Sequence, residues 1–224
     1  MDKRLEEYIY KEVIPKYSLF DEAHQEDHAS AVIRQSFQLL DGKEEWLSKQ
    51  DNPDPLWMKD VDRNMLLTAA ACHDLGLEYG RENHHIDSGR MIRTDNRLKE
   101  WFDENQIETI AQAAEDHRAS GTHAPRSIYG MLVAEADRLI DKETIIRRTI
   151  QYGMKHYPEL DKEMHIARAV GHLKEKYGRN GYLKLWIPWS ENASNLSALQ
   201  DMIANEEAIT TEVACIYEEL DNQA

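Results

Sequence analysis

Residues 61–80 read VDRNMLLTAAACHDLGLEYG, and they contain the most apolar helical pattern of the chain. The middle part of this stretch, 65–72, is apolar almost without interruption. A helix that is apolar nearly all round belongs in the centre of a protein rather than on its surface. Gly76 and Gly80 then interrupt the pattern, because glycine is typical of turns. The stretch therefore predicts a buried central helix over 61–75.

The same periodicity predicts helices along the rest of the chain. Apolar residues recur at three- and four-residue spacing, whereas the alternating pattern that predicts strands is missing. We therefore expect an all-α fold, a helical bundle with a C-terminal helical extension. Helix breaks are expected at Pro15, at Asp41-Gly42 and in the loop 52–55. The expected helices are 5–13, 22–40, 86–92, 98–102, 107–117, 128–140, 145–152, 163–177 and 196–220.

The charge of the chain limits its partners. The 224 residues include 27 Lys and Arg against 42 Asp and Glu, a formal net charge of −15. Nucleic acid is a poor partner for such a chain, because phosphate contacts need clustered Lys and Arg. A small anionic substrate remains compatible, since a bound metal ion supplies positive charge that the net charge does not report. Two cysteines, Cys72 and Cys215, are too few for a disulfide framework or a zinc ribbon.

The sequence also predicts where the protein works and how it is divided. The first residues, MDKRLEE, contain no apolar run typical of a secretory signal. No apolar stretch approaches the ~20 residues of a membrane span. We expect a cytoplasmic protein that binds neither membranes nor nucleic-acid duplexes, with a homodimer as one option. The expected domains are a metal-binding helical domain over 1–157 and a helical extension over 158–224 that packs on it.

His73 and Asp74 follow the apolar helix directly, and this setting indicates chemistry. The dipeptide alone means little, because ten His and eighteen Asp in 224 residues predict about 0.8 such pairs by chance. Burying an unpaired carboxylate costs several kcal/mol, so Asp74 needs a partner. A metal ion is such a partner, and both side chains can reach one where the helix ends.

Further candidate ligands lie on other predicted helices: His28, His84-His85, His117 and Asp137. Several imidazoles and two carboxylates suit a divalent transition metal (Mn, Fe, Ni, Co or Zn) rather than calcium. Facing helices of a bundle commonly hold such ions. The other histidines are expected to be structural or surface residues: His24, His123, His156, His165 and His172.

The order of these residues resembles the H…HD…D signature of the HD-domain superfamily of metal-dependent phosphohydrolases. The resemblance covers residues 20–155 and implies an all-α fold around a buried site for a divalent metal. Five short elements follow one another at similar spacings: DHASAV (27–32), AAACHDLG (69–76), HIDSG (85–89), IAQAAEDHR (110–118) and AEADRL (134–139).

The resemblance assigns the core metal ligands to His28, His73, Asp74 and Asp137. It implies hydrolysis by a metal-activated water, because a metal lowers the pKa of its bound water and polarises the phosphoryl oxygen. Asp74 is then also catalytic, either bridging two ions or orienting the attacking water beside one ion. The pattern is compatible with one ion or two.

Two more histidines match positions that hold a second metal ion or bind phosphate in other members of the superfamily. These are His85 and His117. His84 competes with His85 for the first of these positions, and we favour His85 because Gly89 then falls at the family spacing.

The remaining site residues concern the substrate. Arg118 and Arg126 are the expected phosphate ligands, because guanidinium forks match phosphate oxygens; Arg81 and Lys142 are weaker candidates. Glu78 is a candidate catalytic acid or base. Leu77 replaces the first acid of the H-D-x-x-E-D motif of stringent-response hydrolases, which argues against guanosine tetraphosphate as substrate.

The resemblance implies a metal-dependent phosphohydrolase acting on a small phosphate ester, with nucleotides among the candidates. Two alternatives stay open. A diiron oxygenase of HD type has the ligand order H…HD…H…H…D, which this chain also fills. A non-catalytic module could keep the fold for ligand sensing. The aromatic loop 186–189 could cover a substrate, although packing is the commoner use of such residues.

Overall fold

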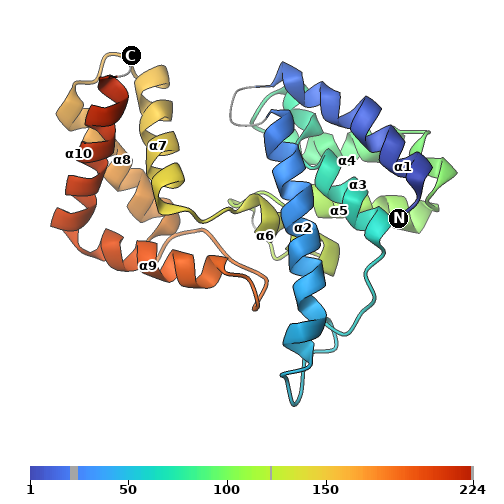
Figure 1. Ribbon diagram of the computed structural model, residues 1–224. Helices are drawn as coiled ribbons and strands as arrows, with labels where there is room; N and C mark the ends of the chain where they lie inside the picture. Colours follow the sequence, from blue (N-terminus) through green and yellow to red (C-terminus); the bar gives the residue numbers. More distant parts are fainter. Residues whose placement is uncertain (21–24, 122, 223–224) are drawn as a thin grey trace. The chain divides into compact units, whose positions relative to one another are not determined.

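The computed structural model describes residues 1–20, 25–121 and 123–222 (Figure 1). Helices account for 69% of these residues, and none of them forms a strand, so the all-α prediction is confirmed. None of their helices is long and apolar enough to cross a membrane. The expected helix start at Glu22, and also His24, lie outside the described residues.

Two compact units make up the chain. The first comprises residues 1–138 and 186–190, and the second comprises 139–185 and 191–224. The boundary expected near Pro158 lies inside the second unit instead. The contacts within the structure thus divide the chain earlier than the sequence pattern suggests, and they assign a short aromatic segment to the first unit.

The N-terminal segment changes helix type twice. The helix α1 (Lys3–Tyr8) is capped by Asp2, whose side chain accepts two backbone N–H groups. It continues as a π turn, η1 (Ile9–Val13), and then as a 3₁₀ helix, η2 (Ile14–Leu19). Pro15 lies in the first turn of η2, where proline is tolerated. The helical segment therefore continues past Pro15 as a 3₁₀ helix, and the break expected there is wrong.

The helix α2 (Glu26–Leu47) runs through the break expected at Asp41-Gly42. Gly42 lies inside the helix because the indole of Trp189 packs against it. A Cβ added to Gly42 would lie 3.3 Å from Trp189 Cδ1. Trp189 Nε1 also donates a hydrogen bond to the carbonyl of Leu39 at 2.7 Å. The expected break is wrong, since this glycine makes room for a ring from far along the chain.

The helix α3 (Arg63–Cys72) is buried from Met65 to Cys72, as expected for a central helix. Asp62 caps its start by accepting two backbone N–H groups. It packs against α2, α5 (Glu104–Glu115) and α6 (Ile128–Asp137). Three of the helices that are expected to carry ligands therefore pack against α3.

After α3 the chain turns through a 3₁₀ helix, η4 (Leu75–Tyr79), into α4 (His84–Thr94). Gly76 allows η4 to contact α4 closely, because a Cβ there would lie 2.0 Å from the carbonyl oxygen of His84 and 2.5 Å from the backbone nitrogen of Ser88. A short 3₁₀ helix, η5 (Leu98–Glu100), stands where a helix over 98–102 was expected.

The second unit consists of four helices that pack against one another (Figure 1). The single long helix expected over 196–220 is wrong, because the chain breaks at Asn205. The Asn205 side chain accepts the backbone N–H of Ala208 at 3.2 Å and starts a new helix there. The four helices are α7 (Lys142–His156), α8 (Lys162–Tyr177), α9 (Asn192–Ala204) and α10 (Glu206–Asp221).

Candidate metal centre

His73 and Asp74 follow the last residue of α3, and both are buried, at 0% and 3% exposure. His73 Nδ1 lies 2.8 Å from the carbonyl oxygen of Ala70. Since a carbonyl can only accept, Nδ1 carries the proton and Nε2 presents its lone pair. Asp74 and His73 thus meet where the helix ends, with one ring nitrogen available as a ligand.

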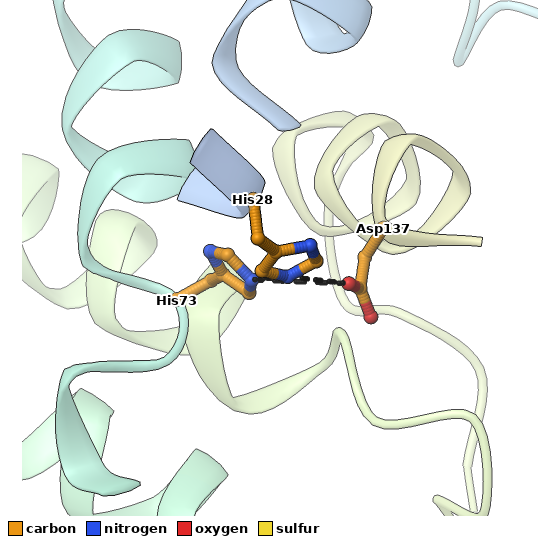
Figure 2. Close-up of side chains that lie close together, drawn as sticks. All are labelled: His28, His73 and Asp137. Carbon is orange, nitrogen blue, oxygen red and sulfur yellow. Dashed lines mark hydrogen bonds and ion pairs between the residues drawn. The ribbon is translucent and has the colours of Figure 1, made fainter. Parts of the chain in front are cut away.

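The first group of potential ligands is His28, His73 and Asp137. Figure 2 shows the three side chains converging from α2, from the end of α3 and from the end of α6. His28 Nε2 lies 3.3 Å from His73 Nε2 and 3.3 Å from Asp137 Oδ1. One atom from each residue lies within 4.8 Å of the others, which is close enough to share an ion.

The second group is Asp74, His84 and His117. Asp74 Oδ1 lies 3.4 Å from His84 Nε2 and 3.3 Å from His117 Nε2. The two Nε2 atoms are 3.2 Å apart. His84 Nδ1 donates to the carbonyl of Arg81 and His117 Nδ1 to that of Ala114, so in the neutral form of each ring the Nε2 lone pair is directed into the group.

Asp74 faces both groups, with one carboxylate oxygen toward each. Its Oδ2 lies 3.4 Å from His73 Nε2 and 3.7 Å from His28 Nε2, whereas Oδ1 faces His84 and His117. A carboxylate in this position can bind an ion on either side. The two groups therefore form one site with six potential ligands.

The electrostatics of the site favour positive charge. Burial lowers the pKa of His28, but hydrogen bonds with Asp137 and Asp74 outweigh burial and raise it to about 9. Burial raises the pKa of Asp74, but the charge of His73 and a hydrogen bond from His117 outweigh it, so the pKa lies well below its usual value. Imidazoles and carboxylates are the ligands that divalent transition metals prefer, and these residues fit such an ion.

Comparison with protein families agrees with this geometry. The family model for the HD domain matches residues 26–140, more than half of the chain. The chain belongs to the HD-domain family. HD proteins are generally metal-dependent phosphohydrolases that bind divalent metals. No curated protein and no solved structure matches the chain significantly.

The HD domain ends close to the end of the continuous part of the first unit, at residue 138. Both groups of potential ligands lie within the matched range. The residue range thus agrees with the position of the site, while the segment that rejoins the first unit at 186–190 lies outside the family match.

The histidine that lies beside Asp74 is His84, which corrects the sequence-based preference for His85. The α4 helix begins at His84, and successive helical residues are rotated by about 100°. Only one of the two rings can therefore face Asp74. The other, His85, lies 3.4 Å from Arg118 through Nδ1 and Nη1. Burial and the charge of Arg118 lower the pKa of His85 to about 4.

The two predicted phosphate ligands differ in their surroundings. Arg126 Nη2 pairs with Glu115 at 2.6 Å and with Asp116 at 2.8 Å, so the HD domain uses it in an ion-pair network. Arg118 donates to the carbonyl of Glu82 and to Ser120 Oγ, the latter at 3.0 Å. In the described part of the chain it forms no ion pair with a carboxylate.

Glu78 belongs to neither of the two groups of potential ligands. It lines a cleft of about 430 Å³ beside η4. The structure therefore does not bring this predicted acid or base to the metal ligands. The other residues that line the cleft are Lys16, Leu19, Phe20, Leu75 and Leu77.

Two residues that sequence reasoning missed hold the backbone of the site. Tyr17 is fully buried; its hydroxyl donates to the carbonyl of Ala71 at 2.8 Å and accepts the backbone N–H of Asp74 at 3.2 Å. Arg138, 6% exposed, donates to the carbonyl of His117 at 3.4 Å. Neither contact has a sequence signal, because each depends on a backbone group far along the chain.

Proposed function

We propose that this protein is a metal-dependent phosphohydrolase that acts on a small phosphate ester, with nucleotides among the candidate substrates. The observation that supports this most strongly is the position of Asp74 between two groups of ligands, with one oxygen facing each. The proposed partner is a small phosphorylated molecule rather than a nucleic-acid duplex or a membrane, in keeping with the acidic chain.

His28, His73 and Asp137 would hold one ion, His84 and His117 a second, and Asp74 would contact both. When bound, the metal supplies a water of lowered pKa and polarises the phosphoryl oxygen. The imidazoles of His73, His84 and His117 donate their Nδ1 protons to backbone carbonyls, which fixes the orientation of each ring.

The residues for the phosphate lie next to the second group. His85 follows His84, Arg118 follows His117, and the two side chains contact each other. Among the described residues no carboxylate pairs with Arg118, and such a guanidinium suits an anionic substrate because its charge is not already neutralised. We therefore assign phosphate binding to Arg118 and His85 rather than to Arg126.

A diiron oxygenase is the second candidate, and one observation favours it. With His84 in place, six side chains in the order His, His-Asp, His, His, Asp converge on one site. A sensing module is a weaker candidate, since a protein without chemistry has no need of a complete set of ligands.

The test measures metal content and then turnover of phosphate esters with Mn²⁺, Co²⁺, Ni²⁺ and Mg²⁺. We expect stoichiometric metal and hydrolysis, both lost in Asp74→Ala but kept in Asp60→Ala, where the aspartate is exposed. Hydrolysis by Asp74→Ala at the wild-type rate would contradict the proposal. Without hydrolysis, an electron paramagnetic resonance signal of a mixed-valent iron pair would indicate the oxygenase.

A further inference from the structure

The aromatic segment Trp186–Ser190 lies outside the family match and yet packs in the core of the first unit. Ile187 is 2% exposed within that core. The ring centroid of Trp189 lies 5.0 Å from that of Trp46 and 5.2 Å from that of Trp57. The segment is therefore a structural part of the HD unit rather than a cover over a substrate.

A buried carboxylate fixes the start of this segment. Glu135 is 0% exposed, and its Oε2 accepts the backbone N–H of Trp186 at 2.7 Å and that of Ile187 at 3.4 Å. Charge-assisted hydrogen bonds of this kind are about twice as strong as neutral ones, and a buried carboxylate depends on them. Glu135 thus ties the aromatic segment to α6.

Glu135 belongs to the last turn of α6, and the metal ligand Asp137 is the final residue of that helix. The last turn of a helix lacks partners for its carbonyl groups and frays readily. A carboxylate at this end also opposes the helix dipole. The turn that carries Asp137 therefore needs support from outside the helix. Glu135, rotated by about 200° from Asp137 around the helix, connects it to the aromatic segment.

We propose that Glu135 is a positioning residue for Asp137. By binding the backbone of Trp186 and Ile187 it holds the last turn of α6, and it thereby sets the geometry of the group His28, His73 and Asp137. This inference rests on the proposed metal site. It gives the polypeptide beyond the family match a role in metal binding.

The test uses the full chain and Co²⁺ as the probe, followed by its visible absorption spectrum, with thermal unfolding of the metal-free protein in parallel. Glu135→Gln keeps the size of the side chain but removes its charge. We expect this variant to raise the Kd for Co²⁺ about tenfold, which is a typical loss of affinity when a residue that supports a metal ligand is replaced. We also expect it to alter the absorption spectrum. Trp189→Phe, which loses the hydrogen bond to Leu39, should change both in the same direction.

Ser127→Ala is the matched control, because Ser127 caps the opposite end of the same helix. It should lower the melting temperature while the Kd and the spectrum stay at the wild-type values. Wild-type Co²⁺ binding by both Glu135→Gln and Trp189→Phe would overturn the inference alone. Absence of Co²⁺ binding by the wild type would overturn the proposed function together with it.

Discussion

His84 Nε2 and His117 Nε2 lie 3.2 Å apart, while each ring donates its Nδ1 proton to a backbone carbonyl. Two lone pairs at this distance repel each other unless a cation or a proton lies between them. Burial and the charge of a protonated His117 lower the pKa of His84. Burial lowers the pKa of His117, but the hydrogen bond with Asp74 and its charge outweigh burial and raise it, so in the metal-free protein the proton favours His117. A divalent cation can take the place of this proton. The pair is thus arranged for a metal ion.

The first prediction follows from this pair. His84→Ala should lose the second metal ion while the first stays bound, because it removes a ligand from the group of Asp74 and His117. His85→Ala should keep both ions. Metal analysis of the two purified variants checks this, and loss of the second ion in His85→Ala instead would restore the sequence-based assignment.

The second prediction concerns pH. Because the pKa of His28 is raised to about 9, this side chain is protonated at neutral pH in the metal-free protein, and a metal must displace its proton. The Kd for metal should therefore fall about tenfold per pH unit between pH 7 and 9 and level off above. Calorimetry in buffers of different ionisation enthalpy would count the released protons.

Metal binding should tighten as the pH rises, whereas the free energy of unfolding of the metal-free protein should fall. A pKa raised from 6.5 to about 9 contributes stability that is fully present below pH 6.5 and is lost as the pH rises through 9. His85→Ala is the control, since the pKa of His85 is about 4 and this ring stays neutral over the whole window. A Kd that does not change between pH 7 and 9 would argue against His28 as a ligand.

The third prediction separates the two arginines. Arg118→Ala should raise KM about tenfold or more, because the substrate loses a charge-assisted hydrogen bond. The free energy of unfolding should stay nearly unchanged. Arg126→Ala should lower that free energy by about 1–3 kcal/mol, because the buried carboxylate of Asp116 loses its guanidinium partner and keeps the backbone N–H of residue 126. Steady-state kinetics and urea unfolding measure the two effects. A normal KM in Arg118→Ala would assign the phosphate elsewhere.

The fourth prediction concerns Gly76. In Gly76→Ala the new Cβ would meet backbone atoms of His84 and Ser88, which cannot rotate away. The free energy of unfolding should fall by about 1–3 kcal/mol, and the second metal ion should bind more weakly. Gly171→Ala, where a Cβ meets nothing within 4 Å, should not destabilise the protein. Equal effects of the two changes in urea unfolding would exclude the steric explanation.

Five of the six potential ligands that the structure groups together were expected from the sequence, because their identity and order carry the chemistry. A charge placed inside an apolar helix, as at Asp74 and Asp137, must be partnered wherever the chain folds. The choice between His84 and His85 could not be made, since it depends on where α4 begins and how it is rotated. Sequence pattern treats adjacent residues alike, whereas the helix directs them to different neighbours.

The contacts missed by the sequence are of another kind. Gly42 has the signature of a helix end, but its neighbour Trp189 comes from the other end of the chain. Glu135 and Tyr17 bind backbone groups, which every residue type presents. Periodicity within a helix therefore predicts the helix, but not the distant segment that packs on it. The same limit explains the division of the chain at residue 138 rather than near Pro158.

The position of Trp186–Ser190 in the first unit has a consequence for biosynthesis. Domains generally fold in order as they leave the ribosome. Here the helix that carries Asp137 emerges long before the residues that hold its final turn, with 139–185 in between. Under the proposed role of Glu135, translation must reach residues 186–190 before the metal site attains its full affinity, so a chain that stops before these residues should bind metal more weakly than the full chain.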